Sequence, residues 1–214
     1  MFPMLSRTAI SYGVLAATLA LAACSGPLPT TPQSYLETLR TTRDAKDRAF
    51  RDAGDSPVPA DRRDDLLPLA YFPADPTYNA VAVLRLPSSP QPVMEMPTST
   101  GLRRQMTRVG SLEFNLKGQA LTLTAFVETN GPGTNQLFVP FTDVTTGTET
   151  YAGGRYLDLE RNGTGIYELD FNVAYHPYCY FDVRFDCPYP PPENRLPLPV
   201  RAGERLPATP TASR

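Results

Sequence analysis

Polar side chains that could hold a ligand gather between residues 138 and 195, where they stand among turn glycines and aromatic residues. Loops on a rigid β scaffold commonly carry sites. Arg155 and Arg195 are the most direct candidates, because a guanidinium binds a carboxylate or phosphate through two parallel hydrogen bonds. Residues that could orient the arginines or wall a ligand are Asp143, Tyr151, Asp170, Asn172, Tyr175 and Glu193. We predict that these residues bind a small anionic ligand, with Tyr156 and Tyr178 as further aromatic walls.

The main alternative for the same residues is a structural role. Buried arginine–carboxylate pairs, and Asp or Asn side chains that hold backbone amides, commonly fix a proline-rich segment in place. A third possibility is hydrolysis by paired carboxylates, in which Asp170 or Glu193 would have a raised pKa in a cleft. No spacing in the sequence selects one pair of carboxylates, so whether the chain is an enzyme stays open.

Cys179 and Cys187 lie close together in the sequence, and His176 precedes them. In an oxidising compartment such a pair forms a disulfide, which we predict here. Closing this short loop would stabilise the fold by about 2.5 kcal/mol. The alternatives are free thiols, or a zinc site that uses His176 with both cysteines. The spacing matches no familiar zinc module, so we predict no metal and no cofactor.

The N-terminus carries a targeting signal. Arg7 precedes an uncharged apolar run over residues 8–20, which is shorter than the roughly 20 residues of a transmembrane helix and typical of a secretory signal. The sequence LAAC at 21–24 resembles the bacterial lipobox, in which the signal is removed before a cysteine that is then lipidated. We predict a lipoprotein signal peptide at 1–23 and lipidation of Cys24; the alternative is a plain secretory signal with a chance cysteine.

Acyl chains on Cys24 would anchor the protein to the membrane without a spanning helix, since each buried methylene contributes about 0.8 kcal/mol. By the same resemblance, Ser25 after the cysteine favours the outer membrane, facing the periplasm, in a Gram-negative host. A Gram-positive host would place the protein on the outer face of the plasma membrane. Residues 24–33 are rich in proline and predict an extended, lipidated tether. The formal net charge of −2 gives no attraction to nucleic acid.

The rest of the chain predicts one helix followed by strands. Residues 34–52 have a helical pattern, with Ser34 as the N-cap and Glu37 three residues later. Short runs with the period and composition of strands follow at 78–86, 111–117, 121–127, 136–141, 155–160 and 165–171. Lys117-Gly118 and Asn162-Gly163 are turn signals between consecutive runs and predict two hairpins.

Antiparallel strands with one apolar face must close or stack to cover that face. We therefore predict a mainly β fold, an antiparallel β-barrel or sandwich with one N-terminal α-helix. After Cys187 the density of proline excludes a regular strand or helix and predicts a Pro-rich C-terminal strap, ordered or loose. The predicted organisation is a single β-rich domain at 34–205 and a disordered tail at 206–214.

Several stretches together resemble DUF1684, a family of uncharacterised bacterial and archaeal proteins. They are YFPAD at 71–75, LFVPFTD at 137–143, TGTETYAGGRYLDL at 146–159, LDFNVAYHPYC at 169–179, and CPYPPPENRLP at 187–197 leading to AGE at 202–204. The likeness covers roughly residues 40–205. Members of that family usually have Asn where this chain has His176. The resemblance implies no established activity.

These patterns predict a membrane-anchored envelope lipoprotein that is a binding or structural module for a small anionic ligand or envelope component. One alternative is a hydrolase that acts on an envelope substrate through carboxylates. The other is a protein-interaction module of an envelope complex, which predicts an exposed apolar patch and no deep pocket. The single histidine excludes sites that need two, and there is no glycine-rich phosphate-binding motif.

Overall fold

The computed structural model describes residues 31–129 and 135–207. The predictions for the signal peptide, for Cys24 and for most of the tether fall on residues 1–30 and lie outside this part of the chain, as do residues 208–214 of the predicted tail. No helix in the described part is both long enough and apolar enough to cross a membrane.

The N-terminal helix α1 spans Pro32–Asp52 and is followed by the short helix α2, Arg63–Leu66. Our prediction of Ser34 as the N-cap was wrong: Thr31 is the cap, and its side chain accepts the Ser34 N–H at 3.2 Å. Pro32 explains the earlier start, because its fixed φ suits the first helical position and it has no N–H to satisfy there. Leu39 and Phe50 form the buried side of α1.

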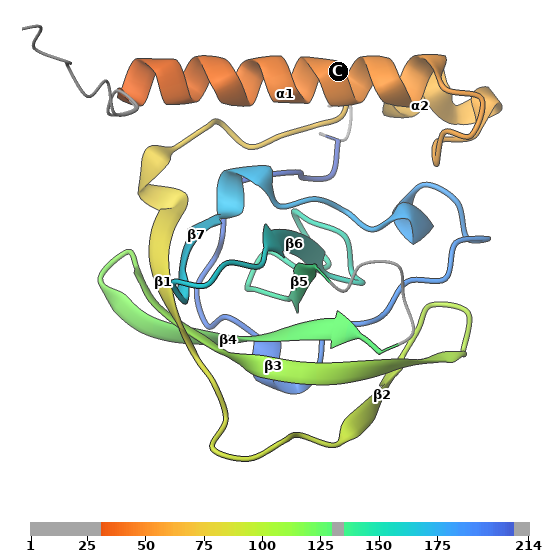
Figure 1. Cartoon of the computed structure of the whole chain (residues 1–214). Coiled ribbons are helices and arrows are strands. Elements are labelled where there is room, and N and C mark those ends of the chain that lie inside the picture. Colours follow the sequence, from red (N-terminus) through yellow and green to blue (C-terminus); the bar gives the residue numbers. More distant parts are fainter. Residues whose placement is uncertain (1–30, 130–134, 208–214) are drawn as a thin grey trace, which may run out of the picture. The chain divides into compact units, whose positions relative to one another are not determined.

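Seven antiparallel strands form one sheet in the described residues, and the sheet curls into a nearly closed barrel (Figure 1). Their order across the sheet is β6-β5-β4-β3-β1-β7, with β2 paired to one end of β3. The strands are β1 Asn79–Arg85, β2 Val93–Pro97, β3 Arg103–Leu116, β4 Gln119–Glu128, β5 Gln136–Phe141, β6 Arg155–Glu160 and β7 Ile166–Asp170. This arrangement confirms the prediction of a mainly β, barrel-like fold with one N-terminal helix.

The two predicted hairpins have different outcomes. Lys117 and Gly118 both have positive φ and join β3 to β4 in a tight hairpin, as predicted. The prediction of a hairpin at Asn162-Gly163 was wrong, because β6 pairs with β5 while β7 pairs with β1. Asn162 instead holds its own turn, where its side-chain oxygen accepts the N–H groups of Thr164 and Gly165. Strand β2 was missed by the sequence analysis, since prolines surround it.

The strap, residues 187–207, is ordered and lies against the barrel, with one side turned into the core and the other exposed. Its alternate residues Leu196, Leu198, Val200 and Ala202 join the main apolar core, while Pro197 and Pro199 are less buried. Proline is tolerated at 197 and 199 because neighbouring residues supply the N–H groups that hold the strap: Leu196 donates to the Thr142 carbonyl at 2.8 Å and Val200 donates to Asp143 at 3.2 Å. The ordered form of the predicted strap is therefore the correct one.

Asn194 of the strap compensates for a weak point in the sheet. Strands β4 and β5 share a single register pair, Phe126 with Phe138. Beside it, the Asn194 amide donates to the carbonyls of Thr124 and Pro140 at 2.8 and 2.7 Å and accepts the Thr124 N–H at 2.7 Å. The strap thus satisfies backbone groups that a complete ladder would have paired, and the two strands can separate farther along.

Candidate functional site

Arg155, the first residue predicted to hold a ligand, is 1% exposed and fastens the strap into the barrel. One terminal nitrogen donates to Asp143 at 2.9 Å and to the Val200 carbonyl at 2.7 Å. The other donates to the carbonyls of Ala202 and Glu204. Burial lowers the pKa of Arg155, and the adjacent Asp143 carboxylate opposes that effect. Its terminal donors are all used by the protein, which matches the structural alternative.

The other predicted residues lie in separate places. Arg195 is exposed, and its guanidinium has no hydrogen bond or ion pair with any described residue. Glu193 is exposed and paired with Arg108. Asp170 accepts the Tyr35 hydroxyl at 2.8 Å, and Asn172 donates to the same hydroxyl at 2.9 Å. These last two residues therefore hold helix α1, and the structure does not bring the predicted set to one ligand.

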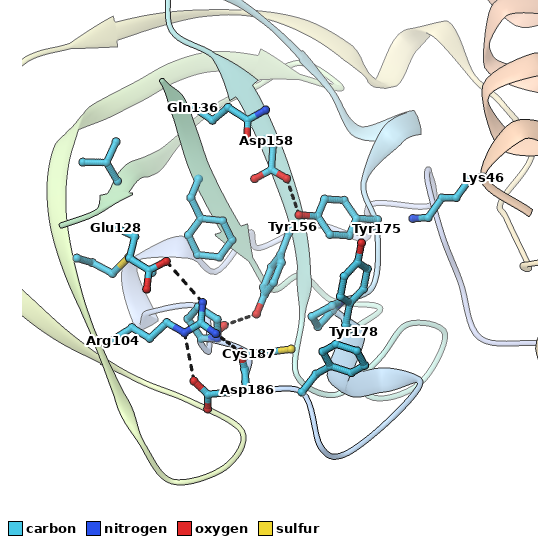
Figure 2. A pocket seen from close by; sticks show the side chains of 16 residues that line it. Lys46, Arg104, Glu128, Gln136, Tyr156, Asp158, Tyr175, Tyr178, Asp186 and Cys187 are labelled. Atoms are coloured by element: carbon cyan, nitrogen blue, oxygen red, sulfur yellow. Dashed lines mark hydrogen bonds and ion pairs between the residues drawn. The ribbon is translucent and has the colours of Figure 1, made fainter. Parts of the chain in front are cut away.

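A cavity of about 590 Å³ is lined by residues of β3, β4, β5 and β6 and of the segment 175–188 (Figure 2). Tyr175, together with Tyr156 and Tyr178, lines it, whereas Tyr151 lies outside the lining set. We call it the tyrosine cavity. Its aromatic walls are Phe138, Tyr156, Tyr175, Tyr178 and Phe185, and its charged residues are Lys46, Arg104, Glu128, Asp158 and Asp186.

Strand β6 supplies two of these groups through the alternation of a β-strand. Arg155 and Leu157 point into the barrel, so Tyr156 and Asp158 lie on the other face of the strand and line the tyrosine cavity. Tyr156 is held by a hydrogen bond from its hydroxyl to the Pro188 carbonyl at 2.5 Å. Its ring also meets the rings of Phe138 and Tyr175 edge to face, at 4.7 and 5.7 Å between centroids. These contacts give the wall a fixed shape.

Asp158 is the carboxylate of the tyrosine cavity that has no cation beside it. It accepts the Tyr175 hydroxyl at 2.5 Å and forms no ion pair within the described part of the chain. Asp158 is an exposed residue, yet the groups around it desolvate its carboxylate enough to raise its pKa, and the Tyr175 hydrogen bond opposes that rise. Burial also raises the pKa of Tyr175, so its hydroxyl stays protonated as the donor.

Both cations of the tyrosine cavity are already neutralised. Arg104 lies 3.1 Å from Asp186 and 3.6 Å from Glu128. Lys46 of α1 lies 2.6 Å from the buried Glu204, and its ammonium is 5.0 Å from the centroid of the Tyr175 ring. The cavity therefore holds one unbalanced negative charge at Asp158 and two carboxylates sharing one arginine.

The cysteine pair lies at the edge of the same cavity, with Cys187 among its lining residues. Both cysteines are buried and present as free thiols; the Cys179 N–H donates to the Cys187 sulfur at 3.1 Å. A hydrogen bond from the Cys187 thiol lowers the pKa of Cys179 to about 6. The two sulfurs are therefore neighbours without being bonded, and the disulfide stays a prediction.

His176 does not face the cysteines as a zinc ligand would. Its Nε2 accepts the Tyr151 N–H at 3.3 Å, and its Nδ1 lies 3.9 Å from a Glu204 oxygen. Burial lowers the pKa of His176 to about 3, so the ring is neutral at physiological pH. Over the described ranges, no three side chains of the metal-binding types gather in one place.

Several cavity residues escaped the sequence analysis. Lys46, Arg104 and Glu128 come from α1, β3 and β4, outside the stretch 138–195 that attracted attention. No sequence signal connects them, because only the folded sheet brings these strands together. Asp158 had a usable signal, since strand alternation puts it on the same face as Tyr156.

Comparison with known proteins supports the resemblance found in the sequence. The family model described as "Protein of unknown function (DUF1684)" matches residues 65–205, so the match begins after α1. The solution NMR structure of an uncharacterized protein from Haloarcula marismortui is 38% identical, with a TM-score of 0.63, over 81% of this chain and 95% of that one. No curated protein matches. The chain belongs to the DUF1684 family.

Proposed function

We propose that this protein is a lipid-anchored binding protein of the bacterial envelope that holds a small organic ligand in the tyrosine cavity. The observation that carries the proposal is the cavity itself, because about 590 Å³ falls in the range of roughly 300–1,000 Å³ found for ligand sites. Its apolar aromatic walls surround one uncompensated polar group, Asp158, which is the usual composition of such sites. The predicted ligand position at Arg155 is replaced by this one.

The envelope anchor in this proposal rests on the LAAC sequence at 21–24 and on the proline-rich segment that follows it. Helix α1 begins at Pro32, so the folded part already includes the last two residues of the predicted tether, 24–33. An extracytoplasmic location would also allow the neighbouring Cys179 and Cys187 to form their disulfide. That bond would tie Cys187, at the cavity edge, to the turn that carries Tyr178.

Binding is better supported than hydrolysis. A two-carboxylate mechanism needs a second acid that is free to act opposite the first. Glu128 and Asp186, the other carboxylates of the tyrosine cavity, are both held by Arg104. Asp170 and Glu193, the carboxylates first considered, bind Tyr35 and Arg108 away from the cavity lining.

Native mass spectrometry of the full chain, purified in mild detergent and incubated with an envelope extract, tests the binding function. We expect an added small-molecule mass that disappears on denaturation. Gln136→Trp, at an exposed position that lines the cavity, should abolish the added mass by filling the opening. Thr122→Trp, at an exposed position on β4 outside the lining, is the matched control. No added mass on the wild type, or retention in Gln136→Trp, would contradict the proposal.

Metabolic labelling with a palmitate analogue tests the anchor. The wild-type chain should carry the label and sediment with the envelope, whereas Cys24→Ser should lose the label. Labelling that persists in Cys24→Ser would reject that lipidation site. The denatured mass of the same sample reports the disulfide, since the oxidised pair has lost two hydrogens.

A further inference from the structure

We propose that the tyrosine cavity selects a small organic cation, an amine or quaternary ammonium compound, whose charged head lies against Asp158 and the tyrosine rings. This inference rests on the proposed binding function and names its ligand class. It reverses the charge of the ligand that the sequence alone predicted, and it follows from how charges and rings are distributed around the cavity.

The first argument is charge balance. Among the described residues, Asp158 has the Tyr175 hydroxyl as its one partner, and Arg104 is shared between Glu128 and Asp186. Lys46 is paired with Glu204 at 2.6 Å. An anionic ligand would have to displace a carboxylate from one of these cations. A cationic ligand would meet a carboxylate that has no cation beside it among the described residues, so the added positive charge is attracted without displacing a partner.

The second argument is the aromatic wall. The face of a tyrosine or phenylalanine ring attracts a cation within about 6 Å, and enclosed rings form the cages that recognise quaternary ammonium groups. Tyr175 and Tyr156 stand edge to face beside Asp158, and Tyr178 and Phe185 form a second edge-to-face pair at 5.3 Å (Figure 2). Lys46 already makes one such contact with Tyr175, at 5.0 Å between its ammonium nitrogen and the ring centroid.

The third argument separates an organic cation from a metal ion. Metal sites bring several oxygen, nitrogen or sulfur ligands to one point. Over the described ranges, no three His, Cys, Asp or Glu side chains lie close enough together to hold a metal ion, and Asp158 therefore belongs to no such group. A single carboxylate among phenol and phenyl rings suits a cation that carries its own apolar surface.

Paired titrations of the full chain in detergent micelles test the ligand class. Choline and its neutral carbon isostere, dimethylbutanol, have nearly the same shape and differ in charge. Ligand-observed NMR should show choline binding at least about tenfold more tightly than the neutral compound. In Asp158→Asn this preference should fall to about twofold or less. The Asn oxygen can still accept the Tyr175 hydroxyl, so the wall keeps its shape.

Glu160→Gln is the matched control, because Glu160 is the next residue on the same face of β6 and does not line the tyrosine cavity. It removes the same charge and should leave the preference for choline unchanged. Equal binding of both probes to the wild type, or an equal loss of preference in the Glu160 variant, would overturn the cation inference.

The same experiments separate the two proposals. If neither probe binds while Gln136→Trp still abolishes an extract-derived mass, the cavity binds a ligand of another class and only the cation inference fails. If the extract yields no mass but choline binds through Asp158, the cation site stands and the proposed retention of an envelope ligand is rejected. If neither probe binds and no mass is retained, both proposals fail.

Discussion

The two faces of strand β6 each carry a charged side chain, and the two side chains differ in their burial and in the number of partners they have. On the inner face, Arg155 is fully buried, yet its charge meets Asp143 and its terminal donors meet three strap carbonyls. On the outer face, Asp158 is exposed, lines the tyrosine cavity and has one hydrogen-bond partner in the described part of the chain, the Tyr175 hydroxyl. A satisfied charge holds a fold together, whereas an unsatisfied charge in a cavity is available to a ligand.

This contrast reverses the expectation drawn from the sequence. Arginine among glycines and aromatic residues suggested ligand recognition, and the structure shows that the terminal nitrogens of Arg155 donate to Asp143 and to three strap carbonyls. Asp158, three positions later on the same strand, has no ion pair in the described part of the chain. The number of partners that a charged group already has, rather than its residue type, therefore distinguishes the structural charge of Arg155 from the candidate site at Asp158.

The largest expected effect is the loss of Arg155. Arg155→Met should lower the free energy of unfolding by about 3–5 kcal/mol, because it leaves Asp143 as a buried charge without its cation and releases the strap. Chemical denaturation followed by circular dichroism measures the change. Arg195→Met, at the exposed arginine, should change stability by less than about 0.5 kcal/mol. Similar values for the two variants would remove the structural role assigned to Arg155.

The next effect is a dependence of stability on acid pH through His176. The pKa of this buried ring is about 3 in the folded protein, against an ordinary 6.5. Between these values the unfolded chain binds a proton that the folded chain does not, so stability is lost as the pH falls from 6.5 towards 3. His176→Asn, whose oxygen can still accept the Tyr151 N–H, should show a shallower loss in urea titrations at several pH values. Equal slopes would contradict this account.

Asp158, on the outer face of β6, should give a pH dependence of stability with the sign opposite to that of His176. The folded-state pKa of Asp158 is raised, so the folded chain keeps a proton that the unfolded chain has released, and stability falls as the pH rises through that window. Asp158→Asn lacks this loss and should be at least as stable as the wild type at neutral pH. Thermal unfolding with Glu160→Gln as the control measures the difference. A clear destabilisation would place Asp158 with the structural charges.

The smallest effect is expected at Glu193, which the sequence analysis placed in the ligand site. Glu193→Gln breaks a half-exposed ion pair with Arg108 and should change stability by no more than about 1 kcal/mol. Binding of choline should be unchanged, because Glu193 does not line the tyrosine cavity. Weaker choline binding in this variant would extend the candidate site towards the strap.

Local patterns in the sequence were sufficient for much of the fold. Alternating runs, the Lys117-Gly118 turn and the capped helix act over a few residues, so they predict elements without tertiary information. Asn162-Gly163 has the same local signature, but its flanking strands lie at opposite ends of the sheet order and pair with other strands. Its failure shows that a turn signal specifies a bend, while strand partners depend on the whole sheet.

The sequence by itself determined the strand periodicity, the presence of a proline-rich strap after Cys187 and the resemblance to DUF1684, because each is written in neighbouring residues. Only the tertiary structure decided which charged side chains are paired and which are left without an oppositely charged partner. Arg104 finds Asp186 far along the chain, Lys46 finds Glu204, and Arg155 finds the strap carbonyls. Electrostatic balance depends on distance in space, so Asp158 becomes a candidate site only after the other charges have been paired.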